Sequence, residues 1–207
     1  MPERDAEVAT EADVQNRLYL WAHRSGHVIS VPNVYYGVGE ADFISVTRSR
    51  SLIEVEIKVW RGDWLRELRV ITEATPRCSQ LDTGADSASH AEASRPRLAS
   101  GAKLLKHHRM QLAVTGGHAF AGIPNYYYVA GLTGVIKEED YPSLPAYVGV
   151  IEVRRHPGLG ANGVHVIRPA KILHHHKLPE RAEAKLSRGI AYRYWATREN
   201  AMSSLYR

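Results

Sequence analysis

The chain has 207 residues, of which 44% are hydrophobic and 24% charged, and its formal charge at pH 7 is +5. This length is enough for one domain with a substantial core, and no segment approaches the roughly 20 consecutive apolar residues of a membrane span. The first nine residues are polar and lack the apolar core of a signal peptide, and the single cysteine, Cys78, excludes an internal disulfide. We therefore expect a cytoplasmic protein with no membrane segment. The basic balance permits binding to a polyanion but does not establish it.

The predicted elements alternate between helices and strands. A capping-box pattern at 10–13 opens a helix whose apolar residues Val14, Leu18 and Trp21 recur at helical spacing, and Gly26 ends it. A short strand at 27–31 follows. Further along the chain we expect strands at 42–47, 52–59, 125–130, 147–153 and 164–167, and helices at 61–71, 102–114 and 179–205.

The composition predicts one folded domain over 10–207, preceded by a flexible N-terminus at 1–9. Residues 73–101 are rich in small, polar and charged residues and have almost no large apolar side chains, so we expect a disordered insertion there. A C-terminal extension is expected from about residue 154.

The stretch from Gly39 to Lys58 is the most informative part of the sequence. An acidic residue, Asp42, opens one β-branched run, and Glu-x-Lys at Glu56 and Lys58 closes the next. Because side chains alternate along a strand, Glu56 and Lys58 project from one face while Val55 and Ile57 fill the other. Burying two carboxylates and an ammonium at one point is costly unless the site uses them.

The register between these two strands decides whether the acids meet. A three-residue loop at 48–50 places Thr47 opposite Ser51 and, counting back, Asp42 opposite Glu56. Opposed β carbons on one face lie roughly 4.5–5.5 Å apart, close enough for two carboxylates to share a cation. A two-residue loop would send the acids to opposite faces. The alternative is a surface strand that carries an ordinary Glu–Lys pair.

This spacing resembles the PD-(D/E)XK nuclease superfamily, with Asp42 as the first acid, Glu56 as the second and Lys58 as the lysine. The order helix, three strands, helix, strand is also that of the superfamily, and the resemblance covers roughly 11–70 and 102–153. It implies an α/β fold with a restriction-endonuclease-like core, in which helices flank a mixed central sheet. Within the superfamily the chain looks closest to MmcB-type DNA-repair nucleases and to related small phage proteins.

The resemblance implies a metal-dependent DNA endonuclease that acts in DNA repair or in phage DNA processing. Asp42 and Glu56 would hold Mg²⁺ or Mn²⁺, which prefer oxygen ligands, with the backbone carbonyl of Ile57 completing the site. Lys58 would orient the attacking water or hold the phosphate, and a salt bridge to Glu56 is compatible with that role. Glu11 is either a further metal ligand or an acid favoured by the helix dipole. A catalytically inactive DNA-binding module and a sequence-specific restriction-type endonuclease remain alternatives.

Basic residues on the predicted helix at 102–114 suggest where DNA would bind. Lys103, Lys106 and His107 recur at i, i+3 and i+4, and we expect them to face solvent and contact backbone phosphates. The opposite side, with Leu104, Leu105 and Leu112, is expected to face inward. Arg61 would extend the same surface. A solvated basic face without function is the alternative, and cutting of both strands would favour a homodimer.

Three other features give weaker predictions. Glu54, one pleat before Glu56, is a support for the site, a further metal ligand or a solvated strand residue. The adjacent histidines at 174–176 cannot all face one ion, so we reject a zinc site there. The tyrosines at 126–128 fit strand core better than base stacking, because alternation buries one or two of them.

Overall fold

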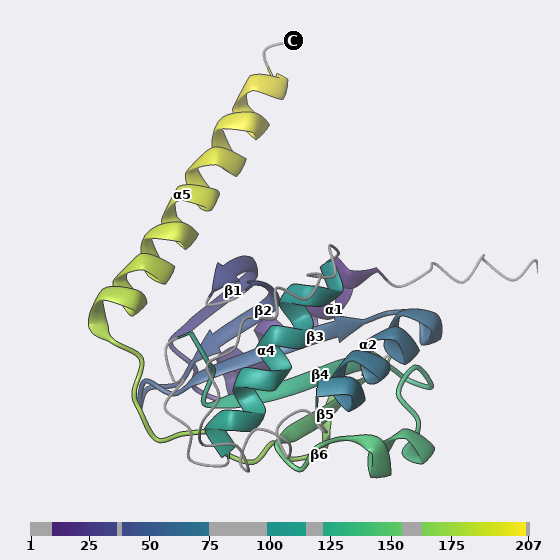
Figure 1. The fold of residues 1–207 in the computed structure, drawn as a ribbon. Coiled ribbons are helices and arrows are strands. Elements are labelled where there is room, and N and C mark those ends of the chain that lie inside the picture. Colours follow the sequence, from purple (N-terminus) through teal and green to yellow (C-terminus); the bar gives the residue numbers. More distant parts are fainter. Residues whose placement is uncertain (1–9, 37–38, 75–98, 115–121, 155–162, 206–207) are drawn as a thin grey trace, which may run out of the picture.

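The computed structural model describes residues 10–36, 39–74, 99–114, 122–154 and 163–205. They form a six-stranded mixed sheet with helices on both faces (Figure 1). The strands lie in chain order across the sheet, namely β1 (Ile29–Tyr36), β2 (Gly39–Val46), β3 (Leu52–Lys58), β4 (Tyr126–Leu132), β5 (Val148–Val153) and β6 (Val164–Arg168). β3, β4 and β5 run parallel, and the other neighbours are antiparallel. The expected α/β class with a mixed, helix-flanked sheet is confirmed.

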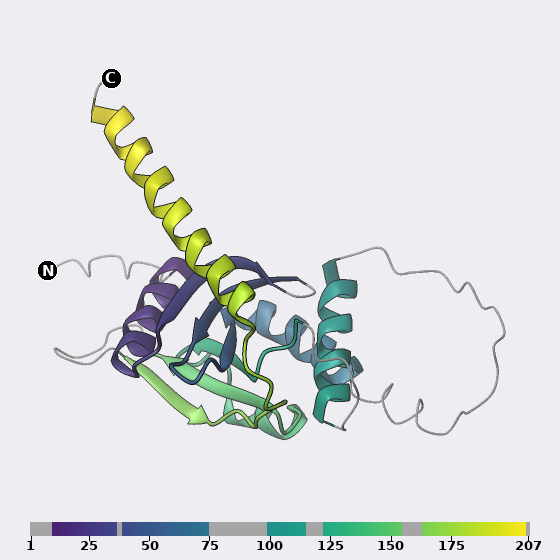
Figure 2. The ribbon, with the colours of Figure 1, turned by 90° about the vertical axis from the view of Figure 1, so that its left-hand side faces the viewer.

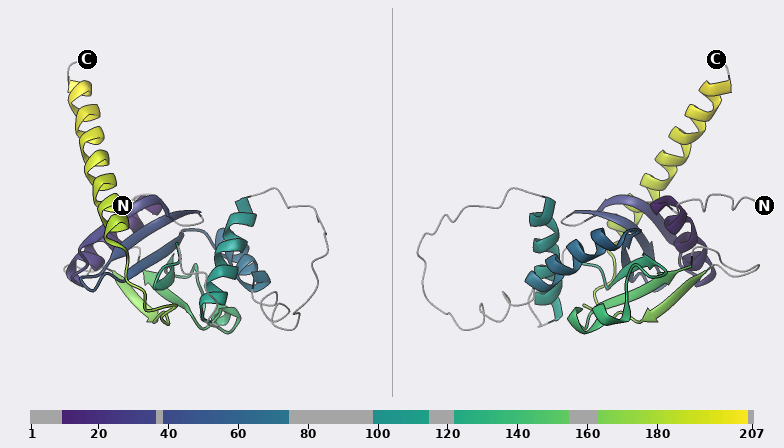
Figure 3. Two further views of the ribbon diagram at one scale, coloured as in Figure 1. Left: turned by 60° about the vertical axis from the view of Figure 1, so that its left-hand side comes forward. Right: turned by 90° about the vertical axis from the view of Figure 1, so that its right-hand side faces the viewer.

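The helices divide between the two faces of the sheet. α1 (Glu11–Arg24) covers one face, and α2 (Arg61–Ala74) and α4 (Ala99–Val114) cover the other (Figure 2). Parallel β3 and β4 need a crossover, and α2 and α4 lie in the chain between them. A short 3₁₀ helix, η1 (Glu138–Ser143), precedes β5, and α5 (Glu180–Leu205) extends away from the sheet (Figure 3). In the described ranges, no helix combines the length and apolar character that a membrane crossing requires.

The observed boundaries differ from the predicted ones in two informative places. β1 continues to Tyr36 through Pro32, which is tolerated because β1 is an edge strand. The two ends of the predicted insertion at 73–101 belong to α2 and α4, and its remainder, 75–98, lies outside the described residues, as does the predicted flexible N-terminus at 1–9.

The turn between β2 and β3 has the predicted three-residue length. The Thr47 amide donates to the Ser51 carbonyl (3.0 Å), and Arg50 takes the left-handed conformation (φ 63°) that closes such loops. Val46 then pairs with Leu52, and Phe43 with Val55. This is the register predicted from the sequence, and continuing it by one residue sets Asp42 against Glu56.

The same turn anchors the start of α5. The Arg50 side chain forms ion pairs with Glu180 and Glu183, each at 3.1 Å, and its carbonyl accepts a hydrogen bond from the Leu178 amide (2.8 Å). Leu178 and Leu186 then pack on apolar residues of the first three strands, namely Ile29, Val31, Ala41, Ile44, Val46 and Leu52.

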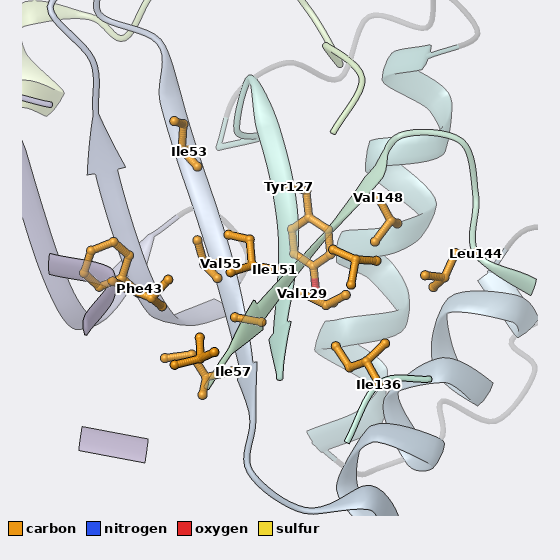
Figure 4. Close-up of a cluster of buried hydrophobic side chains, with 14 of the residues drawn as sticks. Phe43, Ile53, Val55, Ile57, Tyr127, Val129, Ile136, Leu144, Val148 and Ile151 are labelled. Carbon is orange, nitrogen blue, oxygen red and sulfur yellow. The ribbon is translucent and has the colours of Figure 1, made fainter. Parts of the chain in front are cut away.

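The main core lies along β3 and its neighbours. Phe43, Val55 and Ile57 point to one face, and α1 contributes Val14 and Leu18 to the same buried cluster (Figure 4). Full burial of such a side chain contributes about 1.5–3 kcal/mol. Alternation then places Asp42, Glu54, Glu56 and Lys58 on the opposite face, under α2 and α4. Of the three tyrosines of β4, Tyr127 is fully buried, as expected for strand core.

Candidate functional site

A cavity of about 380 Å³ lies at the carboxyl end of β3. It brings together every residue predicted to act in catalysis or to hold a metal: Glu11, Asp42, Glu56, Ile57 and Lys58. The other residues of its wall are Val59, Asp63, Arg66, Glu67, Val70 and Lys103. Segments far apart in the sequence, from α1, β2, β3, α2 and α4, therefore form one site.

Asp42 is fixed by the backbone of the neighbouring strand. Its Oδ2 accepts a hydrogen bond from the Ile57 amide at 2.7 Å. Burial, followed by the charge of Glu56, raises the pKa of Asp42 to about 6, although the Ile57 amide and Lys58 partly offset this. Glu11 adds to the rise. The pocket thus concentrates negative charge around Asp42.

Glu56 is buried and held by two ammonium groups. Lys58 Nζ lies 2.5 Å from Glu56 Oε1, so the expected salt bridge is present. Lys103, which reaches in from α4, contacts the same oxygen. Both cations also approach Glu67 on α2, Lys103 at 3.0 Å and Lys58 at 3.5 Å.

Glu67 was not predicted from the sequence. Burial works to raise its pKa, but the hydrogen bond with His107 and the charges of Lys58 and Lys103 outweigh it and hold that pKa below its usual range. The resulting carboxylate only accepts hydrogen bonds, so His107 Nε2 donates to Glu67 Oε1 at 3.1 Å. The signal that could have revealed Glu67 is its position between Trp64 and Ile71 on the buried face of α2.

Glu11 lies at the mouth of the site on an exposed part of α1. Gln15, one turn later, has its amide nitrogen 3.0 Å from Glu11 Oε1 and 3.0 Å from the Asp42 carbonyl. The same nitrogen lies 2.7 Å from Asn33 Oδ1 on β1. Gln15 therefore ties α1 to the strand that carries Asp42 and keeps Glu11 beside it.

The predicted orientation of α4 is wrong. Lys106 and His107 are 5% and 1% exposed, whereas Leu105, expected to be inside, is 50% exposed. Lys106 contacts the carboxylate of Glu54 on β3. The physical reason is the row of carboxylates beneath the helix. Leaving these buried charges without cationic partners would cost more free energy than exposing a leucine. Lys106 and His107 are thus internal groups and do not form an exposed surface for DNA.

Arg61, predicted to extend the DNA-binding surface, forms ion pairs within the protein, and its side chain is 30% exposed. Its guanidinium binds both carboxylate oxygens of Asp140, with Nη2 2.8 Å from Oδ1, and donates to the Val135 carbonyl (3.0 Å). The Trp64 indole donates to Asp140 Oδ2 at 2.7 Å. Arg61, followed by the Lys137 amide and Trp64, lowers the pKa of Asp140 to about 2, although burial opposes this.

Glu54 and the triple histidine have structural roles. Glu54 is buried beside Lys106 and does not line the cavity. The carbonyls of His174 and His176 accept hydrogen bonds from the Asn125 side-chain amide at 2.8 and 2.9 Å. Asn125 also accepts from the Leu52 amide (2.7 Å), so it joins β3 to the segment that leads into α5.

The cavity offers the kind of ligand atoms that a hard divalent cation prefers, but its side chains are not arranged around a common point where a cation could bind. Asp42, Glu56, Glu11 and the Ile57 carbonyl offer only oxygen, which Mg²⁺ and Mn²⁺ prefer. Across the described ranges, however, no three carboxylate, histidine or cysteine side chains are grouped so that they could hold a metal ion. Glu56 is occupied by ammonium groups, so cation binding would require Lys103, whose side chain is 40% exposed, to withdraw.

Comparison with known proteins adds little to this geometry. No protein-family profile matches the chain, and no curated protein matches it. The chain is similar to a solved structure described as "SPO1766 protein of unknown function from Silicibacter pomeroyi", with 13% sequence identity over 87% of this chain and 85% of that one. The TM-score of this similarity is 0.44.

Proposed function

We propose that the chain is a metal-dependent nuclease of the PD-(D/E)XK type that hydrolyses phosphodiester bonds in DNA. The observation that carries this proposal is the convergence of Asp42, Glu56 and Lys58 in one cavity, fixed by the register of β2 and β3. The order of the elements around them, one helix, three antiparallel strands, a helical crossover and a parallel strand, supports the same family.

The proposal assigns a role to each group in the cavity. Asp42, Glu56 and the Ile57 carbonyl would hold Mg²⁺ or Mn²⁺, with Glu11 at the mouth as a further ligand. When bound, the ion would supply Lewis acidity and a water of lowered pKa. Lys58, fixed between Glu56 and Glu67, would orient the attacking water or hold the phosphate. Lys103 would leave Glu56 and become available to a phosphate of the DNA backbone.

The test is cleavage of a substrate panel in the presence of different cations. Supercoiled plasmid, linear duplex, single strand and branched junction are incubated with the protein in Mg²⁺, Mn²⁺ or excess EDTA. We expect cleavage with Mg²⁺ or Mn²⁺, none in EDTA, and none by Asp42→Asn. Asp63→Asn is the matched control, because Asp63 lines the same cavity but pairs with Arg66. Robust cutting in EDTA, or equal loss in both variants, would contradict the assignment.

A second candidate function is DNA binding without turnover. The contact of Lys58 and Lys103 with one oxygen of Glu56 favours it, because these cations neutralise the carboxylate that a metal would need. The same panel separates the two functions. Binding to DNA with no cleavage of any substrate in either metal would select the inactive module.

A further inference from the structure

α5 carries an exposed stripe that the proposed active site does not use. Arg181, Lys185, Arg188, Tyr192 and Trp195 recur at i, i+4, i+7, i+11 and i+14, a spacing that places them on one side of a helix. All five are exposed, Tyr192 at 78% and Trp195 at 62%. We call these five residues the α5 stripe.

Two side chains outside the stripe hold α5 to the body of the protein. Leu186 packs on the apolar face of β1 and β2, and Arg193 donates hydrogen bonds to the carbonyls of Pro32 and Asn33. The helix is thereby held at its base while the α5 stripe remains turned to solvent. Figures 1 and 3 show the rest of the helix standing clear of the sheet.

Positive charge is concentrated around this stripe. Residues 169–195 contain six Lys and Arg but only two Glu, within a chain whose whole formal charge is +5. Both glutamates, Glu180 and Glu183, are paired with Arg50. Within the described part of the chain, no ion pair joins a carboxylate to Arg181, Lys185 or Arg188.

We propose that the α5 stripe binds single-stranded nucleic acid, with its three cations on successive phosphates and Tyr192 and Trp195 stacked on bases. Arg181 and Arg188 are separated by about 10 Å along the helix axis, so the three cations can reach different phosphates of one strand. Aromatic side chains next to a cationic track are the combination that single strands recognise. A symmetric contact between two copies of the stripe would set these cations against one another, whereas a polyanion compensates their charge.

This inference deepens the proposed function and rests on it for the class of polymer, but it can be tested without turnover. Affinities are measured in EDTA, over a range of salt concentrations, for a labelled oligothymidine and for a duplex of the same length. The charge variant combines Arg181→Ala, Lys185→Ala and Arg188→Ala, which are exposed positions where alanine favours the helix. The control removes three exposed arginines elsewhere, with Arg24→Ala, Arg48→Ala and Arg69→Ala.

The charge variant is expected to bind the oligothymidine at least about tenfold more weakly and to flatten its salt dependence by about two units of slope. A second variant, Tyr192→Ala with Trp195→Ala, should lose about tenfold for the single strand, little for the duplex, and keep the salt slope. Wild-type affinity in the charge variant, or an equal loss in the control, would overturn the proposal.

Sedimentation of each variant tests whether a second copy of the chain, and not nucleic acid, binds the α5 stripe. If the charge variant changes the oligomeric state while its affinity for nucleic acid stays at the wild-type value, the α5 stripe is a self-association surface and the proposal is wrong. Absence of cleavage by a protein that still binds through the stripe would remove the nuclease function and leave this inference standing.

Discussion

Lys106 on α4 contacts the carboxylate of Glu54 on β3, and their side chains are only 6% and 1% exposed. Removing one member of a buried pair leaves an uncompensated charge, whereas replacing both with apolar groups of similar volume is often neutral. We expect Lys106→Met alone to lower the free energy of unfolding by about 3 kcal/mol. Lys106→Met combined with Glu54→Met should recover most of that loss. Urea denaturation measures both, with the exposed Lys171→Met as the control. A double variant that is no more stable than Lys106→Met alone would show that the residues do not act as a pair.

Asp42→Asn and Glu56→Gln should both reduce cleavage by at least about 100-fold but shift stability in opposite directions. Burial, then the charge of Glu56, raises the pKa of Asp42 to about 6, so its carboxylate is a destabilising group when ionised. Asn at this position should stabilise the metal-free protein by about 1 kcal/mol at pH 8. Gln at position 56 removes the partner of Lys58 and Lys103 and should cost about 2 kcal/mol.

The pH dependence of the Asp42→Asn effect provides its control. Between pH 4 and 6 the folded protein holds a proton on Asp42 that the unfolded chain releases, so wild-type stability falls as pH rises through that window. The advantage of the Asn variant should therefore vanish at about pH 4. Thermal unfolding of both proteins from pH 4 to 8 measures this difference in stability. A difference that stays constant with pH would show that it comes from packing and not from the charge of Asp42.

Substitution of Lys58 should mainly lower the cleavage rate, whereas substitution of Lys103 should mainly lower the affinity for DNA. Lys58→Ala is expected to lower the single-turnover rate by about 100-fold at saturating protein, with little change in DNA affinity measured in Ca²⁺. Lys103→Ala should weaken affinity at all sequences alike, because its proposed contact is a backbone phosphate. It should also tighten Ca²⁺ binding in the absence of DNA, since it removes one of the two ammonium groups that contact Glu56. If Lys58→Ala cuts DNA at the wild-type rate, the proposed role of Lys58 is wrong.

Asp140 should contribute stability that depends on pH. The hydrogen bond from Arg61 is the main reason that the pKa of Asp140 falls to about 2, below the usual 3.8. Its contribution is therefore present above about pH 4 and is lost as pH falls towards 2. Asp140→Asn is expected to cost about 1–2 kcal/mol at pH 7 and progressively less below pH 4. Urea denaturation at several pH values tests this, and the exposed Glu138→Gln serves as the control.

The parts of the site that depend on local geometry were predictable from the sequence. The register that brings Asp42 to Glu56 follows from the length of one turn and the alternation of side chains, and both can be counted. The position of Lys58 beside Glu56 follows in the same way. The helical spacing of α1 was enough to predict that Glu11 lies near the sheet.

The orientation of α4 could not be predicted by the same reasoning. Its polar and apolar residues form two faces of similar extent, and which face turns inward depends on what lies beneath it. The deciding groups, Glu54 and Glu67, lie about 40–50 positions earlier in the chain, so their attraction for Lys106 and His107 appears only once the elements are packed. The positive charge of the α5 stripe likewise could not be recognised from α5 alone. It depends on Arg50, which lies far away in the sequence and pairs with Glu180 and Glu183.

The turn that ends at Ser51 is subject to two independent requirements on its length. One residue fewer would rotate Asp42 away from Glu56, and it would also withdraw Arg50 from Glu180 and Glu183. Substitutions at Arg48 and Ser49 alter neither relationship as long as the count is kept and Arg50 remains. In more distant relatives we therefore expect insertions and deletions to accumulate between other elements while this interval stays constant. Its length would then be a more durable guide for aligning such sequences than the identity of the residues within it.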